Sequence, residues 1–352
     1  MLLDRHALSN EYDGGDPLCK ECPPRIFFLK TARRISFLEV YMRIAVFGVG
    51  GVGGYFGGRL AQSGEDVFFI ARGEHLQALR GNGLLLENPD GGVTEIPAKA
   101  TDDPAEVGPV DVVILGVKAW QVQEAAERLR PLIGPDTFVV PLQNGVEAPS
   151  QLAATLGARH VFGGLCYIVS FMVGPGRIRH AGMEPRVVFG ELDNRPSDRA
   201  QRLLQSFANA ALHAEIPPDI QAAIWSKFLF ISSLSGVGAV TRAPVGVVRS
   251  IPETRNMLKE AIAEAAVVAR ALKIGLKENA VESTMAVIDA LPAGTTASMQ
   301  RDIMEGRPSE LSAQSGALVR LGKEAGQAVP LSLYIYSSLL PLELRARGKA
   351  EF

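Results

Sequence analysis

A glycine-rich turn between an apolar run and a helical stretch constrains the fold of this chain more than any other feature. Ile44–Phe47 predicts a buried strand, and Tyr55–Ala61 predicts a helix. Between them the pattern GxGxxG is formed by Gly48, Val49, Gly50, Gly51, Val52 and Gly53. In this context the first glycine permits a tight turn, the second lets a pyrophosphate approach the backbone, and the third lets the helix pack closely on the strand. The helix N-terminus adds N–H groups and a positive dipole. The pattern indicates the start of a dinucleotide-binding Rossmann domain, with a turn that serves packing only as the alternative.

The end of the second predicted strand bears on which dinucleotide is bound. This strand, Asp66–Ala71, is followed directly by Arg72, at a place where NAD sites have an Asp or Glu that binds the ribose hydroxyls. A guanidinium pairs with a 2′-phosphate and stacks on adenine, whereas a carboxylate repels that phosphate. Arg72 therefore favours NADP(H) over NAD(H), unless it is only a solvated surface charge.

Two more apolar runs complete the prediction of a doubly wound parallel sheet. Asp111–Val117 and Thr137–Leu142 are almost continuously apolar, as expected for strands covered on both faces. Lys118 follows the first run, and Asn144 lies just after the second. Ligands of such sheets lie at the carboxyl ends of the strands, so we expect both side chains to face the same crevice as Gly50. Either residue alone also fits an ordinary loop position.

The second half of the chain predicts an all-helical domain. Strand-like runs and a helix from Ser197 to about Ala211 precede Ile216-Pro217-Pro218, which we take as the domain boundary. Beyond it, apolar residues recur with helical spacing. The expected helices include 224–234, 258–272, 278–290, 297–305, 309–325 and 331–347. The predicted architecture is an α/β Rossmann domain over residues 42–216 followed by an all-α domain over residues 219–347.

Three polar residues of the helical half are candidates for chemistry. Lys227 lies between Trp225 and Phe228 on the most apolar predicted helix, where desolvation can lower its pKa toward neutrality and suit it to proton transfer. The alternative is a lysine whose stem lies along apolar surface while the amine stays in water. Glu310 is expected in the first turn of a helix, where it can favour the helix dipole, and Ser298 can cap a helix.

The first 41 residues differ from the rest of the chain. Residues 10–17 lack periodicity, and Pro23-Pro24 interrupts any helix directly after them. Cys19 and Cys22 form a CxxC pair with no second ligand pair of matching spacing, so no metal site is expected. No secretory signal is recognisable. We expect residues 1–41 to be a disordered extension, or an artefact of a start codon chosen upstream of Met42.

Composition excludes several classes of protein. Lysine and arginine number 36 against 38 acidic residues, which removes the broad basic surface of a nucleic-acid-binding protein, although a local basic pocket is compatible with it. No uninterrupted apolar run approaches the roughly 18 residues that span a bilayer. Three cysteines form no disulfide framework and suit a reducing compartment. We therefore expect a cytoplasmic protein that acts on a small molecule and binds neither nucleic acid nor membrane.

Taken together, these residues resemble the ketopantoate reductase (2-dehydropantoate 2-reductase) family from Met42 to about Arg345. Beyond the glycine turn and Arg72, the resemblance rests on motifs that occur in the family's order along the chain. These are Val117-Lys118-Ala119-Trp120-Gln121, Leu142-Gln143-Asn144-Gly145, Trp225-Ser226-Lys227-Phe228, Ser298-Met299-Gln300-Arg301-Asp302, Glu310 and Gly316-Ala317-Leu318-Val319-Arg320. The family implies a Rossmann domain, a helical domain and a substrate cleft between them. It also implies NADPH-dependent reduction of 2-dehydropantoate to (R)-pantoate, on the route to pantothenate and coenzyme A.

The resemblance also implies roles for individual residues. Lys227 matches the family's catalytic lysine, which favours proton transfer over the solvated alternative. Lys118 and Asn144 match positions that contact the cofactor, and Asn144 can also touch the substrate. Ser298 and Glu310 match polar positions of the substrate cleft, with Glu310 also close to the nicotinamide end. A homodimer contact through the helical domain is compatible with the sequence but not demonstrated by it.

Several positions depart from the family pattern. Asn residues that the family often has four and eight positions after the lysine are Ile231 and Ser235 here, and a third corresponds to Val245. An Asp two positions after the family's Glu is Ser312. Much of the polar contact set for the substrate has therefore changed. Two alternatives follow: an NADPH-dependent reductase of a different 2-oxo acid, or an NADP(H)-binding regulatory protein without turnover.

Overall fold

A five-stranded parallel sheet forms the centre of the first domain in this computed structural model, which describes residues 41–351. The expectations for residues 1–40 lie outside the described residues. The strand order is β5-β2-β1-β6-β7. The strands are β1 (Arg43–Phe47), β2 (Asp66–Ile70), β5 (Lys99–Thr101), β6 (Val110–Leu115) and β7 (Ile133–Pro141). This order places the ends of β1, β2, β6 and β7 side by side, which confirms the predicted doubly wound sheet.

Both faces of this sheet are covered by helices because its strands are apolar on both sides. Ile44 and Val46 of β1 pack in one apolar cluster with α1 and α5, whereas Ala45 and Phe47 pack in another with α3 and α4. The helices of this domain are α1 (Gly51–Gln62), α2 (Gly73–Asn82), α3 (Val122–Arg128), α4 (Ala148–Leu156) and α5 (Asp198–Asn209). Ser197, expected to open the last of these, caps it by accepting a hydrogen bond from Ala200 N.

Two smaller sheets extend the α/β domain, and the sequence indicated little of them. One has the order β4-β3-β10-β9, and the other has the order β12-β11-β8. Their strands are β3 (Leu84–Glu87), β4 (Val93–Ile96), β8 (Phe162–Tyr167), β9 (Ser170–Gly174), β10 (Arg177–His180), β11 (Arg186–Glu191) and β12 (His213–Glu215). Strand β9 lies at an edge and reaches the glycine turn, since a Cβ added at Gly51 would lie 2.4 Å from Ser170 O.

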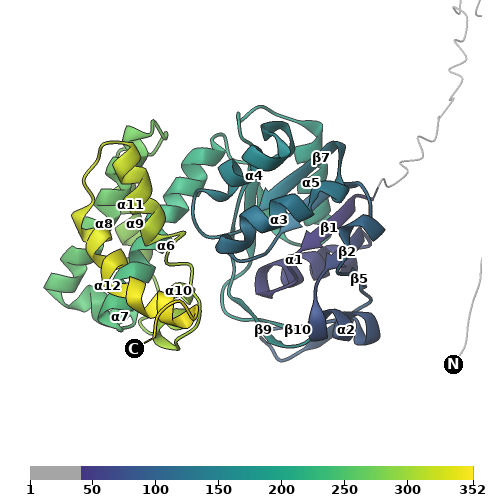
Figure 1. Cartoon of the computed structure of the whole chain (residues 1–352), viewed down its shortest axis with the longest axis horizontal. Coiled ribbons are helices and arrows are strands. Elements are labelled where there is room, and N and C mark those ends of the chain that lie inside the picture. The colour runs from purple at the N-terminus through teal and green to yellow at the C-terminus, as the bar shows by residue number, and fades with distance from the viewer. Residues whose placement is uncertain (1–40, 352) are drawn as a thin grey trace, which may run out of the picture. The chain divides into compact units, whose positions relative to one another are not determined.

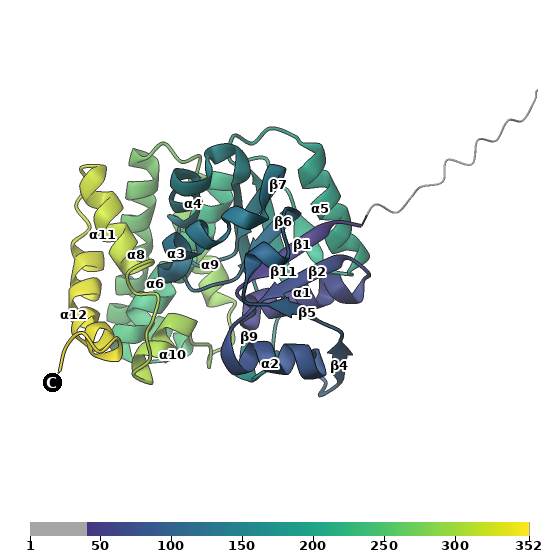
Figure 2. The same cartoon turned by 45° about the vertical axis from the view of Figure 1, so that its right-hand side comes forward.

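Every helix from α6 onward belongs to the second, helical domain, which confirms the predicted fold class (Figure 1). Its helices are α6 (Ile220–Thr241), α7 (Val245–Ser250), α8 (Pro252–Ala271), α9 (Ala280–Asp289), α10 (Ser298–Met304), α11 (Ser315–Glu324) and α12 (Pro330–Ala346). Helix α6 contacts α8, α9, α10 and α12, and both views show it between α12 and the α/β domain (Figure 2).

The apolar character of α6 serves the core of this domain. Its 22 residues are long and apolar enough to cross a bilayer by length and composition alone. The expectation that no apolar stretch approaches this length did not count a stretch interrupted by polar residues. However, 72% of its most apolar window is buried inside the protein. Asp219 starts the helix by accepting a hydrogen bond from Ala222 N at 3.0 Å.

The helix expected over 309–325 is shorter than predicted, because α11 begins only at Ser315. Ser309 instead donates from its N–H and its hydroxyl to the buried carboxylate of Glu343 on α12. Glu310 therefore does not lie in the first turn of a helix, as the sequence suggested, but in an irregular segment that turns toward the α/β domain. Tertiary hydrogen bonds override the local helical pattern here.

Candidate functional site

A pocket of about 670 Å³ lies where the carboxyl ends of the parallel strands meet α6 and α10. Every candidate residue of the sequence lines it except Gly53, which lies behind the turn. The two domains contribute opposite walls. Size and position are those expected of a small-molecule site in an α/β protein.

The pocket is more basic than the chain as a whole, which carries a net charge of −2. Its lining includes twice as many lysines and arginines as carboxylates. The cations are Arg72, Lys118, Arg128, Lys227, Arg301 and Arg307, and the carboxylates are Glu124, Asp302 and Glu310. Such a surplus of positive charge attracts anionic ligands.

The glycine turn has the geometry that a bound phosphate requires. Gly48 has a φ of +94°, which favours glycine. A Cβ on Gly50 would meet nothing within 4 Å, so this backbone faces open space, whereas one on Gly53 would lie 2.2 Å from Gly48 O. The hydrogen bond from Gly54 N to Gly50 O, 2.8 Å long, starts α1 and leaves the preceding N–H groups to a ligand. The turn therefore fits a dinucleotide, and each glycine has the geometry predicted for it.

Arg72 follows β2 at one end of the same pocket, as predicted. Within residues 41–351, the only ion pair of its guanidinium is with the carboxylate of Glu124, at 3.4 Å. Both side chains are more than half exposed, so the pair contributes little to stability. The guanidinium can therefore exchange this partner for a phosphate at little cost.

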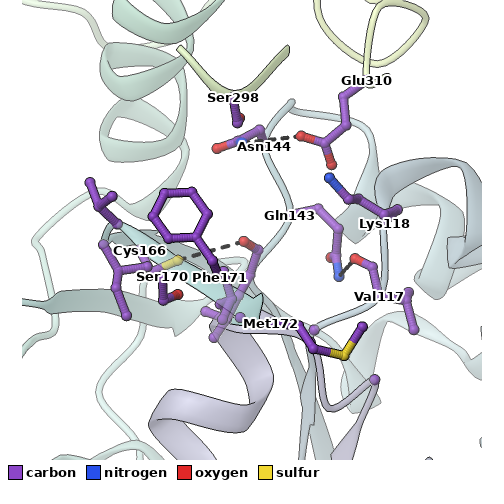
Figure 3. Close-up of a pocket in the computed structure, with 18 of the residues that line it drawn as sticks. Val117, Lys118, Gln143, Asn144, Cys166, Ser170, Phe171, Met172, Ser298 and Glu310 are labelled. Atoms are coloured by element: carbon purple, nitrogen blue, oxygen red, sulfur yellow. Dashed lines mark hydrogen bonds between the residues drawn. The ribbon is translucent and has the colours of Figure 1, made fainter. Parts of the chain in front are cut away.

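Lys227, Asn144 and Glu310 form a hydrogen-bonded chain in the middle of the pocket. Lys227 Nζ donates to Asn144 Oδ1 at 3.0 Å, and Asn144 Nδ2 donates to Glu310 Oε2 at 3.1 Å. Figure 3 shows Asn144 between Glu310 and Ser298, which points toward it. The sequence placed these residues in one cleft, and the structure brings them together from the loop after β7, from α6, from α10 and from the segment before α11.

The amine of Lys227 does not reach bulk water. The residue is only 9% exposed, which excludes the solvated alternative considered for it. Burial lowers the pKa of Lys227, and the negative charge of Glu310 and the nearby Cys166 thiol offset part of this effect. The Tyr167 ring centroid lies 5.6 Å from Nζ. Lys227 is therefore a desolvated amine whose proton is easier to release than that of an exposed lysine.

Hydrogen bonds from the loops fix the position of Asn144. Gln143 Nε2 donates to Leu115 O at 2.8 Å and to Val117 O at 3.0 Å, which ties the loop after β7 to the end of β6. Gly145 has a φ of +111°, and a Cβ there would lie 2.8 Å from Ala313 O. Because glycine permits this close approach, the loop packs directly on the segment that carries Glu310.

Polar contacts cross the cleft on the side of Lys118. Glu310 Oε1 accepts a hydrogen bond from Ala119 N at 3.3 Å, and Lys118 Nζ lies 3.5 Å from Asp302 Oδ2. Asp302 is also paired with Arg307 at 2.9 Å. Both pocket carboxylates of the helical domain are therefore engaged with other residues.

Of the positions that depart from the family pattern, the structure places only Ile231 in the wall of the pocket. Ser235 is fully buried and Val245 is 2% exposed, and neither lines the pocket. Ser312 is exposed and its hydroxyl accepts a hydrogen bond from Arg320. Among these departures, a change in the pocket wall itself therefore rests on Ile231 alone.

Sequence reasoning missed part of the pocket wall. Cys166 on β8 and Ser170 and Phe171 on β9 line the pocket, as does Arg301 on α10. Cys166 is the third cysteine of the sequence, and burial raises the pKa of its thiol. Residues of β8 and β9 carry no motif that would have indicated them, whereas Arg301 stood inside a quoted motif without a role.

Comparisons with known proteins agree with this architecture. Residues 44–194 match the family model "Ketopantoate reductase PanE/ApbA", and residues 219–343 match "Ketopantoate reductase PanE/ApbA C terminal". The oxidoreductase YkpB of Bacillus subtilis (strain 168) is 30% identical over 85% of this chain and 98% of its own length. A 2-dehydropantoate 2-reductase of Nostoc sp. is 27% identical over 87% and 96%, respectively. The solved structure of D-mandelate dehydrogenase with NADH and anilino(oxo)acetate is 25% identical, with a TM-score of 0.79 over 87% of this chain and 99% of that one.

Proposed function

The chain belongs to the ketopantoate reductase family of oxidoreductases, and we propose that it uses NADPH to reduce the ketone of a 2-oxo acid to a 2-hydroxy acid. The first candidate substrate is 2-dehydropantoate, which would give (R)-pantoate. The observation that carries the proposal is the buried amine of Lys227, held by Asn144 in the pocket that also contains the glycine turn.

The residues of the turn support a nicotinamide dinucleotide as the cofactor. The open backbone at Gly50 and the first N–H groups of α1 would hold its pyrophosphate. Arg72, exposed and weakly paired at the end of β2, would take the 2′-phosphate that distinguishes NADPH from NADH. The similar D-mandelate dehydrogenase structure contains NADH, so the assay below compares NADPH with NADH. When bound, the reduced cofactor supplies a hydride to the ketone carbon.

The residues of this chain would manage the charge and the proton. As negative charge develops on the ketone oxygen, the ammonium of Lys227 would stabilise it and donate the proton. Asn144 orients the amine through its Oδ1 atom, and Glu310 holds the other end of the Asn144 amide. Ser298 would donate to the substrate carboxylate, and Glu310 would accept from a substrate hydroxyl. The contacts across the cleft would help to exclude water from the reacting centre.

NADPH oxidation in the presence of 2-dehydropantoate tests this function directly. We expect steady-state turnover that depends on both compounds and a lower kcat/KM with NADH. The control is Lys227→Met, which keeps an unbranched side chain but removes the amine. Tight NADPH binding without oxidation by any 2-oxo acid would instead support the regulatory alternative.

Ile231 favours a second candidate, a 2-oxo acid that lacks the hydroxyl group of 2-dehydropantoate. With Phe230, Leu234 and Leu291 it forms an apolar stretch of the pocket wall. A panel of branched, aromatic and hydroxylated 2-oxo acids, ranked by kcat/KM, separates the candidates. If the apolar substrates lead, Ile231→Asn should shift the ranking toward 2-dehydropantoate, because it adds an amide where the family pattern often has one.

A further inference from the structure

Arg301 lies in the pocket wall and is held by residues of both domains. It lies on α10, three residues after Ser298, so both residues face the same side of the helix. Nη1 donates to Thr296 O at 2.6 Å and to Thr296 Oγ1 at 3.1 Å. The Cζ atom lies 5.6 Å from the ring centroid of Phe171 on β9, a cation–π distance across the cleft. These contacts fix the guanidinium and leave Nε and Nη2 without a hydrogen-bond partner among residues 41–351.

The positive charge of Arg301 is not neutralised by an ion pair with any carboxylate in the described part of the chain. The neighbouring Asp302 is held by Arg307 and Lys118, and Glu310 accepts from Asn144 and Ala119. Partial burial lowers the pKa of Arg301 and the nearby charge of Arg307 adds to this effect, whereas the charge of Asp302, which is already paired, offsets part of it. A positioned and partly desolvated guanidinium in a pocket indicates that an anionic ligand completes it.

We propose that Arg301 binds the carboxylate of the substrate through its Nε and Nη2 atoms. This assignment rests on the proposed function, in which the substrate is a 2-oxo acid. A guanidinium edge matches a carboxylate with two parallel hydrogen bonds, whereas Ser298 alone supplies one neutral donor. Arg301 thus provides the charge that selects an acid, and Ser298 adds a third hydrogen bond from the same face of α10.

The cofactor phosphates are the other anions that could reach this pocket, and the structure favours the substrate over them. The pyrophosphate has its own donors at the N-terminus of α1, and Arg72 lies at the end of β2. Arg301 instead belongs to the helical domain, which also carries Lys227 and Ser298. A carboxylate on Arg301 would therefore lie on the side of the pocket where the ketone meets the amine.

The test compares an acid with its uncharged analogue. For the best 2-oxo acid and its methyl ester, kcat/KM is measured with NADPH for the wild type, Arg301→Met and Arg301→Lys. We expect Arg301→Met to lose about 10- to 100-fold with the acid and little with the ester, from the usual contribution of hydrogen bonds to charged groups. With the acid, kcat/KM of Arg301→Lys should lie between the values of the wild type and Arg301→Met, since lysine keeps the charge but not the planar edge. The matched control is Arg270→Met, which removes an exposed arginine of α8 outside the pocket and should keep the preference for the acid.

Binding measurements separate substrate from cofactor. NADPH affinity, from the quenching of protein fluorescence, should be equal in the wild type and Arg301→Met, while oxamate should bind the NADPH complex of the wild type only. If Arg301→Met still reduces the ester, the variant is folded. If Arg301→Met keeps the preference for the acid, or loses NADPH affinity instead, the assignment is overturned while the proposed function stands. If the wild type reduces no 2-oxo acid and binds no oxamate, the proposed function itself fails and the assignment fails with it.

Discussion

Replacing Lys227 with methionine is the sharpest test of the site, because the change removes one buried amine and little volume. Nζ lies 3.0 Å from Asn144 Oδ1, and no carboxylate within residues 41–351 forms an ion pair with it. If the ammonium donates the proton to the ketone oxygen, kcat should fall by roughly 10²–10⁴. This corresponds to about 3–5 kcal/mol of transition-state stabilisation. NADPH affinity should change little, since the amine belongs to α6 of the helical domain, whereas the glycine turn belongs to the α/β domain.

The pH dependence of the rate identifies the proton donor. Burial lowers the pKa of Lys227 below its usual 10.5, so in the wild type kcat should decline with rising pH earlier than an exposed lysine would allow. Lys227→Met should lose this basic limb, and Lys227→Arg should keep the charge but not the proton transfer, because a guanidinium does not deprotonate. Stopped-flow or steady-state oxidation of NADPH across the alkaline range measures both effects.

The same substitution makes a prediction for stability. The folded pKa of Lys227 is lower than the unfolded one, so folding disfavours the protonated amine. This cost is complete below the folded pKa and disappears as pH rises from the folded pKa toward 10.5. Thermal unfolding should therefore show a stability difference between Lys227→Met and the wild type that shifts in favour of the wild type over that interval.

Full turnover in Lys227→Met, or an unchanged basic limb in its rate profile, would refute the assignment of Lys227 as proton donor.

Four further substitutions test other parts of the site. Arg72→Ala should raise KM for NADPH much more than KM for NADH, and an equal rise for both would contradict the 2′-phosphate contact. Gly53→Ala should lower the melting temperature, because its Cβ would lie 2.2 Å from Gly48 O, whereas Gly50→Ala should keep the fold and weaken cofactor binding in a fluorescence titration. Glu310→Gln removes a negative charge that raises the pKa of Lys227, so the basic limb of the rate profile should move to lower pH; a limb that stays in place would show that the two groups are not coupled.

Reasoning from sequence located the polar residues of the site but not all of their surroundings. Asn144 was predictable because polar residues at the ends of parallel strands meet at one edge of the sheet. For Lys227, the apolar neighbours on its helix left a buried and a solvated amine both open, and the family resemblance favoured proton transfer. Arg301 was not, since its significance depends on Asp302 and Glu310 being engaged by other residues, which no spacing along the chain records.

Two errors have the same origin. The segment around Glu310 was predicted as helix, yet Ser309 is held by the carboxylate of Glu343, 34 residues away in the sequence. Ile231 and Ser235 have the helical spacing of one face, yet only Ile231 reaches the pocket. In both cases the local sequence fits two outcomes, helix or irregular segment at Ser309 and pocket wall or core at Ser235. Packing against distant parts of the chain decides between them.

Local patterns by themselves determined the framework of this protein. The glycine turn, the strands apolar on both faces and the helical periodicity after Pro218 each depend on residues close together in the sequence, so they predict the Rossmann domain and the helical domain directly. Tertiary structure alone decided which charges in the cleft are neutralised, how deep the amine of Lys227 lies, and which wall of the pocket is apolar. Electrostatic energy and desolvation depend on distances between side chains from separate elements, and those distances exist only once the two domains have packed together.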